Sequence, residues 1–157
     1  MSRILKSIAV GVLLLCGIPV SSVLAQSGSA ITTDGIADNR VDMTQRQVAH
    51  LLKPGSNGNN CWISRSGLTV VMDRGIVVLV QTESPQLATL SGARVGMTER
   101  ALRSLYPGRL ELPNFGYRRL YYYSSSGNAI SFAINEEKST DITAGKRWII
   151  TYDEYCA

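Results

Sequence analysis

The chain has little of the chemistry that enzymes and metal sites use. Its 157 residues include one histidine, His50, and three cysteines. Zinc sites need a set of cysteine, histidine or carboxylate ligands, and the sequence has neither an H-E-x-x-H pattern nor an aspartate-rich calcium loop. His50 lies beside Leu51 and Leu52, where a place facing solvent or at a helix edge explains it. We therefore expect no catalytic residue, no metal site and no cofactor, and a protein that is not an enzyme.

Long apolar runs are absent except near the N-terminus. Arg3 and Lys6 precede an apolar stretch over residues 8–20, and Val23 and Ala25 are small residues at the positions that signal peptidase reads. This order is typical of a signal peptide over residues 1–25, with cleavage after Ala25. We therefore expect a periplasmic or secreted protein.

The N-terminus has two other interpretations. A membrane anchor needs roughly 18 uninterrupted apolar residues, whereas Gly17 and Pro19 interrupt this run. A lipoprotein would use Cys16, but the bulky Leu15 precedes it and the apolar segment continues beyond it. No stable membrane insertion is expected after cleavage.

The expected mature chain keeps two cysteines, Cys61 and Cys156. Exported chains meet an oxidising environment in which thiols pair, so we expect one disulfide between them. It would close a loop of about 95 residues and contribute roughly 4–5 kcal/mol on the chain-entropy model. The alternative is two free, buried thiols.

Charge gives no argument for a nucleic-acid partner. The full chain has 16 basic and 12 acidic residues, and removal of Arg3 and Lys6 with the signal peptide leaves 14 and 12. The arginines alternate with acids and form no basic stripe. We expect no nucleic-acid binding.

A short block of sequence occurs twice. Val41-Asp42-Met43-Thr44 recurs 54 positions later as Val95-Gly96-Met97-Thr98, and the same offset aligns residues 76–80 with 130–134. We interpret the chain as a flexible leader and one domain of two tandem repeats, each a helix, a hairpin and a return strand. The expected bounds are residues 26–34 for the leader, 35–157 for the domain, and 35–90 and 91–157 for the repeats.

Local signals place the elements of each repeat. Thr44 and Thr98 are good helix N-caps, and Gln47 completes a capping box, which predicts helices over residues 45–52 and 99–106. Runs of β-branched and aromatic residues predict strands over 61–63, 68–72, 76–81, 120–123, 129–135 and 147–152. The expected fold class is α+β, an antiparallel sheet with two short helices on one face.

Strand alternation sends every second side chain to the same face of the sheet. With Ile130, Phe132 and Ile134 under the helices, the opposite face is expected to carry Val77, Leu79, Arg119, Tyr121, Tyr123, Trp148 and Tyr152. Such side chains are typical of protein-binding hot spots. A phase shift of one residue would place the same set in the core.

Gly96-Met97-Thr98, with its counterpart Asp42-Met43-Thr44, resembles the tandem helix-plus-sheet repeat of secreted β-lactamase-inhibitor-like proteins. The ending Asp153-Glu154-Tyr155-Cys156 is similar to the tail of small exported proteins with such repeats. The resemblance spans about residues 36–156 and departs from the pattern at Asp42. It implies a protein that binds a partner, commonly an enzyme that it inhibits, through the open face of its sheet.

Two looser resemblances rest on shorter stretches of the sequence. Gly-Met-Thr also begins a helix in outer-membrane assembly lipoproteins, but the lipid-bearing cysteine of that group is missing here. Ser91-Gly92-Ala93-Arg94 is similar to a run in periplasmic lysozyme inhibitors, whose fold is a barrel.

The leading hypothesis is an exported protein-binding module, an inhibitor or immunity protein for an envelope enzyme. One alternative is a cell-wall enzyme that uses the acidic doublets Glu136-Glu137 or Asp153-Glu154. Adjacent residues on a strand point to opposite faces, which favours solvated turns at these doublets. The other alternative is a structural envelope protein.

Overall fold

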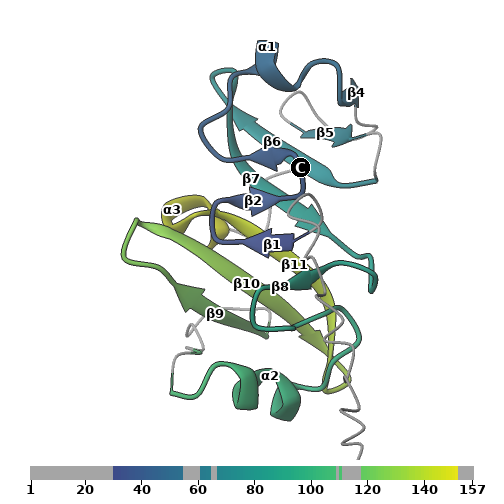
Figure 1. Cartoon of the computed structure of the whole chain (residues 1–157), viewed down its shortest axis with the longest axis vertical. Helices are drawn as coiled ribbons and strands as arrows, with labels where there is room; N and C mark the ends of the chain where they lie inside the picture. Colours follow the sequence, from purple (N-terminus) through teal and green to yellow (C-terminus); the bar gives the residue numbers. More distant parts are fainter. Residues whose placement is uncertain (1–29, 55–60, 65–66, 109, 111–117, 152–157) are drawn as a thin grey trace, which may run out of the picture.

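The computed structural model describes residues 30–54, 61–64, 67–108, 110 and 118–151. These residues form mainly strands, arranged as a four-stranded and a seven-stranded sheet (Figure 1). The described residues include three short helices, α1 (Gln45–Val48), α2 (Glu99–Leu105) and α3 (Arg147–Ile150). The expected α+β class with two helices on one face is therefore wrong, because the chain is mostly β.

The smaller sheet has the strand order β3-β2-β1-β8, with β1 and β8 parallel. Its strands are β1 (Ala30–Thr32), β2 (Gly35–Ile36), β3 (Asn39–Arg40) and β8 (Ala88–Thr89). Ile31 and Ile36 are fully buried, so residues 30–34 belong to the folded domain and not to a flexible leader. Residues 26–29 of the expected leader lie outside the described residues, as does the whole expected signal peptide.

The larger sheet has the order β4-β5-β6-β7-β11-β10-β9, and all its neighbours are antiparallel. Its strands are β4 (Leu52–Pro54), β5 (Cys61–Ser64), β6 (Thr69–Asp73), β7 (Ile76–Thr82), β9 (Arg119–Tyr123), β10 (Asn128–Asn135) and β11 (Lys138–Lys146). The two expected hairpins, β6–β7 and β9–β10, are confirmed within a residue or two at each end. Strand β11, which pairs with β10 and β7, was missed.

Both main helices start as expected. The Thr44 hydroxyl accepts from the Gln47 N–H in a capping box, and the Thr98 hydroxyl accepts from the Ala101 N–H. Helix α2 matches its expected range within a residue, whereas α1 ends at Val48 because the chain turns there and enters β4.

The two repeated blocks enter the large sheet in the same way. The Val77 N–H donates to the Met43 carbonyl, and the Ser139 N–H donates to the Met97 carbonyl. The N···O distance is 2.8 Å in both hydrogen bonds. The two methionines are 54 positions apart, but their strand partners are 62 apart (139 − 77). The structural counterpart of β7 is therefore β11, and the expected alignment of residues 76–80 with 130–134 is wrong.

The same 62-residue offset holds across the large sheet. The hairpins β6–β7 and β10–β11 each have a register shift, between Val71 and Met72 and between Ala133 and Ile134. In the β7–β11 pairing, Gln81 faces Thr143, its own counterpart at this offset. The two halves of the sheet are thus related by an approximate two-fold axis through that pair.

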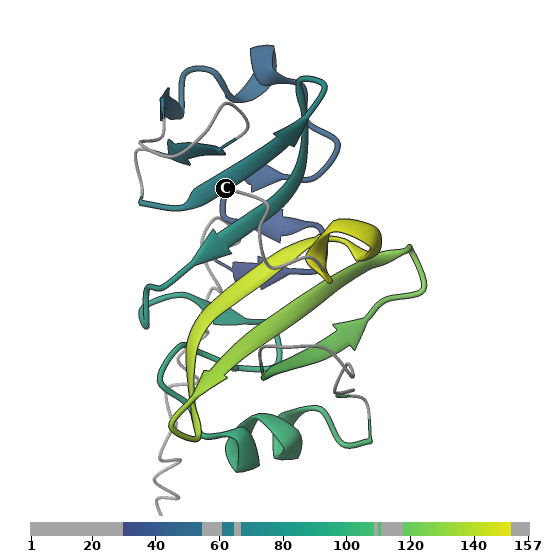
Figure 2. The same ribbon diagram turned by 180° about the vertical axis from the view of Figure 1, so that it is seen from behind.

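Both faces of the large sheet are covered. One hydrophobic cluster includes Ile31, Val48, Leu102 and Phe132 and lies beneath the small sheet, α1 and α2. A second cluster lies on the other face, where Ile150 of α3 packs among residues of the sheet. Figure 2 shows α3 in front of the large sheet with the small sheet behind it.

The expected strand over residues 147–152 is helix α3 over its described part. Strand β11 already occupies the place beside β10, so the chain after Lys146 has no sheet position left there. The Arg147 N–H instead donates to the Gly127 carbonyl over 3.0 Å, and α3 contacts β7, β10 and β11. Tertiary packing thus overrides the β propensity of Trp148, Ile149 and Ile150.

Gly145 is the position where the central pairing is most sensitive to substitution. A Cβ there would lie 2.6 Å from the Val78 carbonyl oxygen and 2.9 Å from the Leu79 Cα. We predict that Gly145→Ala lowers the free energy of unfolding by about 1–3 kcal/mol, the usual range for overpacking, in urea denaturation. The control is Gly127→Ala, where a Cβ meets nothing within 4 Å but φ is +82°; its backbone strain should cost about 1–2 kcal/mol. A Gly145→Ala variant as stable as the wild type would contradict the close approach.

Candidate functional site

Three of the residues expected on an open face are buried. Val77 belongs to the main core, because the register shift beside it changes the strand phase. Leu79 and Tyr121 do lie on the opposite face, but α3 covers that face and leaves them 0 % and 2 % exposed. The expectation that these three side chains face solvent is wrong.

The remaining predicted residues differ in their surroundings. Trp148 on α3 is 53 % exposed. The Tyr123 ring is half-buried, stacks on Tyr121 at 6.0 Å between centroids, and lies under the Arg147 guanidinium at 4.1 Å. Tyr152 lies outside the described residues.

Arg119 forms a largely buried ion pair with Asp141, with 3.0 Å between Nη1 and Oδ1. Asp141 Oδ1 also accepts from the Thr143 hydroxyl, and Arg119 Nη1 donates to Ser131 Oγ. These bonds join β9, β10 and β11, so this cluster pins three strands together. Arg119 thus has a structural partner and is not a free docking residue.

The candidate site lies on the other side of the large sheet, in a cavity of about 410 Å³ between the small sheet, the end of α2 and strands β9 and β10. A volume of this size is at the lower end of the range for ligand pockets. It is lined by Ile31, Thr32, Thr33, Asp34, Arg40, Thr89, Leu90, Ser91, Tyr106, Tyr122, Ser124 and Ile130.

The buried part of the cavity combines apolar and hydroxyl groups. Ile31 and Ile130 provide aliphatic surface. The Tyr106 hydroxyl donates to Thr89 Oγ1 over 2.8 Å, and both residues are about 95 % buried. Burial raises the pKa of Tyr106 above its ordinary value of 10.0, against the opposing effect of hydrogen bonds with Thr89 and Ser91.

Thr89 joins two parts of the cavity wall. Its hydroxyl is hydrogen-bonded to the Tyr106 hydroxyl at 2.8 Å, and its oxygen also accepts from the Ala93 N–H at 3.0 Å. The residue that follows α2 is thereby held against the loop that follows β8.

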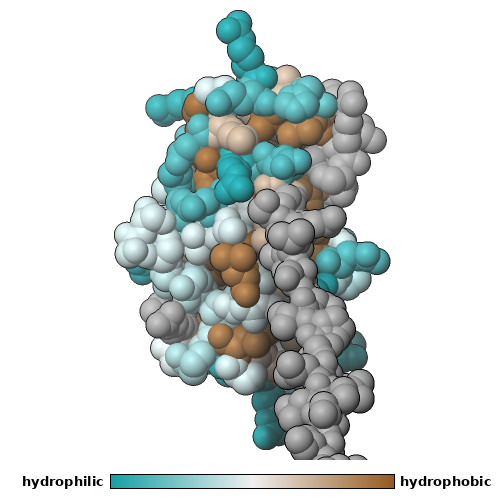
Figure 3. Space-filling view, in the orientation of Figure 1, coloured by the Kyte–Doolittle hydropathy of each residue, from teal (hydrophilic) through white to brown (hydrophobic). Residues whose placement is uncertain are grey.

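The rim carries an exposed leucine and two opposite charges. Leu90 is 82 % exposed. Asp34 accepts from the Asn128 side-chain amide over 2.7 Å, whereas the Arg40 side chain makes no hydrogen bond or ion pair with the described residues. Figure 3 shows this side of the molecule, where hydrophobic residues reach the surface within a mostly polar area.

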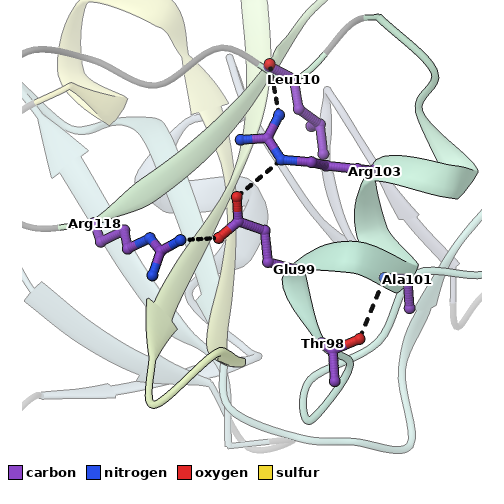
Figure 4. A network of polar contacts seen from close by, with 6 residues as sticks. All are labelled: Thr98, Glu99, Ala101, Arg103, Leu110 and Arg118. Atoms are coloured by element: carbon purple, nitrogen blue, oxygen red, sulfur yellow. Dashed lines mark hydrogen bonds and ion pairs between the residues drawn. The ribbon is translucent and has the colours of Figure 1, made fainter.

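A second hollow, of about 350 Å³, lies beside α2. Glu99 accepts from Arg103 Nε over 2.8 Å and also pairs with Arg118, while Arg103 Nη1 donates to the Leu110 carbonyl (Figure 4). Because one carboxylate bonds both guanidinium groups, this cluster ties α2 to the chain that enters β9.

The acidic doublets gain no support as a catalytic pair. Glu136 and Glu137 form the two-residue turn between β10 and β11, with positive φ values of 48° and 65°, and both are exposed. Asp153 and Glu154 lie outside the described residues. Within the described residues, no group of three histidine, cysteine or carboxylate side chains is placed to hold a metal ion. None of the described helices has the length and apolar character needed to cross a bilayer.

Comparisons with known proteins gave no match to a family model, a curated protein or a solved structure.

Sequence reasoning missed the cavity because its walls come from distant segments. Asp34 belongs to the expected leader, and Arg40 lies in a stretch for which no helix or strand was expected. Neither Leu90 nor Tyr106 was expected on the binding surface. An isolated leucine between Thr89 and Ser91, in a loop of small polar residues, was the one local signal of exposure.

We predict that Tyr106→Phe lowers the free energy of unfolding near pH 8 by about 1 kcal/mol, the usual net worth of one hydrogen bond. The raised pKa adds a pH signature. Because the folded state keeps the phenol proton more tightly, this stabilisation is complete below pH 10.0 and declines as the pH rises further. Urea midpoints between pH 8 and 11 should therefore fall more steeply in the wild type than in the variant. Parallel curves would show that Tyr106 does not titrate differently in the two states.

Proposed function

We propose that the protein is an exported protein-binding module that acts without catalysis and contacts its partner through the face that carries the cavity. An inhibitor or immunity protein for an envelope enzyme is the role we favour. Its resemblance to secreted β-lactamase-inhibitor-like proteins supports a partner-binding role, but the surface differs from the one that the sequence indicated.

One observation carries the proposal: Leu90, a large hydrophobic side chain, is 82 % exposed at the rim of a cavity that contains two tyrosines and an arginine. Leucine gains about 1.5–3 kcal/mol when fully buried, so a partner that covers it has a source of affinity. Tyrosine and arginine are the residue types enriched in binding hot spots.

Export rests on the signal-peptide pattern of residues 1–25, and the Cys61–Cys156 disulfide is expected as a consequence of export. Cys61 begins β5, whereas Cys156 lies outside the described residues. We predict that the protein recovered after export starts at Gln26 and reacts with iodoacetamide only after reduction, as read by intact mass. Reduction should lower the free energy of unfolding by roughly 4–5 kcal/mol on the chain-entropy model. Alkylation of two thiols without reductant would overturn the disulfide.

Two matched variants test the binding surface. Leu90 and Trp148 are the large hydrophobic side chains exposed among the described residues. Leu90 lines the cavity with Ile31 and Ile130, whereas Trp148 belongs to α3, which packs on the other face of the large sheet. Leu90→Ser should weaken binding of a purified partner at least tenfold, while Trp148→Ser should leave it unchanged. The partner is first captured from envelope extract and identified by mass spectrometry, and its affinity for each variant is then measured by calorimetry.

The reverse result would move the binding surface to the α3 face, and equal affinities would remove Leu90 from the interface. Because both side chains are exposed, each substitution should change stability by less than about 0.5 kcal/mol. A thermal melt of each variant serves as the folding control.

A further inference from the structure

The cavity has chemical features that define what it receives, and this inference rests on the proposed function. We propose that it binds a peptide segment of the partner in which a large apolar side chain lies next to a carboxylate side chain, as in a Leu-Glu pair. The apolar side chain packs on Ile31, Ile130 and Leu90, and the carboxylate faces Arg40.

The anionic requirement comes from Arg40. A guanidinium is always charged at physiological pH and has five N–H donors, which suit a carboxylate. Arg40 lines the cavity and has no ion-pair partner among the described residues. Arg40 is the one basic residue among the described residues that line this cavity, so it is the cation available there to an incoming acid.

Asp34 limits the ligand to a single acidic group and adds a negative charge at the rim opposite in sign to Arg40. Its carboxylate is fixed at the rim by the Asn128 amide over 2.7 Å, so a second anionic group nearby is repelled. The N–H groups of a peptide backbone are suitable donors to this carboxylate. A peptide with one acidic side chain pairs with both Arg40 and Asp34, the carboxylate with the first and a backbone N–H with the second.

The test uses three short probes on the isotope-labelled chain recovered after export: acetyl-Leu-Glu-amide, acetyl-Leu-Gln-amide and acetyl-Ala-Glu-amide. In NMR titrations the Leu-Glu probe should shift the resonances of Leu90, Tyr122 and Arg40. It should bind at least tenfold more tightly than either of the other two. Equal affinity for the Glu and Gln probes, shifts confined to other regions, or no binding would overturn the proposal.

Two arginine variants complete the experiment. Arg40→Gln should abolish the preference for the Glu probe, whereas Arg46→Gln, at an exposed position on α1, should preserve it. Preference retained in Arg40→Gln would overturn the role of Arg40. If Leu90→Ser still weakens partner binding while the probes fail, the binding face stands and only the assigned occupant is wrong. If the probes bind as expected while Leu90→Ser leaves partner binding intact, the cavity is a peptide site and the proposed docking surface is wrong.

Discussion

The backbone pairing of β7 with β11 is the interaction on which the rest of the structure depends. It is the only ladder that joins the two halves of the large sheet within the described residues, and it runs from Ile142↔Thr82 to Gly145↔Leu79. Each half contributes its own hairpin and its own helix start. The absence of a side chain at Gly145 lets the two backbones approach, since a Cβ there would overlap the Val78 carbonyl. Without this pairing, neither hydrophobic cluster could span both halves.

The approximate two-fold axis also explains why the two faces differ. After β11 the chain has completed the second repeat, and its continuation as α3 crosses only one face of the sheet. The small sheet covers part of the other face, where it packs Ile31 and Ile36 into the main core. The cavity forms where this cover meets Tyr106 and Tyr122. A symmetric sheet with asymmetric covers thus presents one hollowed face and one face built around a short helix.

Local features of the fold could be predicted from the sequence. The threonine caps, the 99–105 helix and the two hairpins depend on neighbouring residues, and the repeat itself is visible as two short blocks. Asp42 and Gly96 differ in type but share a positive φ, 69° and 88°, a conformation that aspartate tolerates better than most residues.

What failed depended on tertiary context. Strand β11 contains Asp141, Ala144 and Gly145, and the low β propensity of these residues hid a strand that is specified by its two neighbours. Because this strand was missed, the second halves of the two repeats were aligned with an offset of 54 residues instead of 62. For the same reason, residues 147–152 were expected to form the next strand of the sheet. The binding surface was misplaced for the same reason, because the burial of Leu79 and Tyr121 depends on where α3 lies. The cavity needs residues from Ile31 to Ile130 brought together, which no local pattern reports.

The central position of β7 has a consequence for the unassembled chain. Ile76–Thr82 is a seven-residue segment, Ile-Val-Val-Leu-Val-Gln-Thr, with no charge and no proline. Its partner β11 begins 56 residues after the end of β7, from Thr82 to Lys138. During synthesis or unfolding, β6 can therefore pair with one edge of β7 while the backbone N–H and C=O groups of the other edge remain unpaired. Such segments aggregate readily when exposed. The strand that joins the two repeats is therefore also the part of the molecule most prone to pair with other chains whenever β11 is absent.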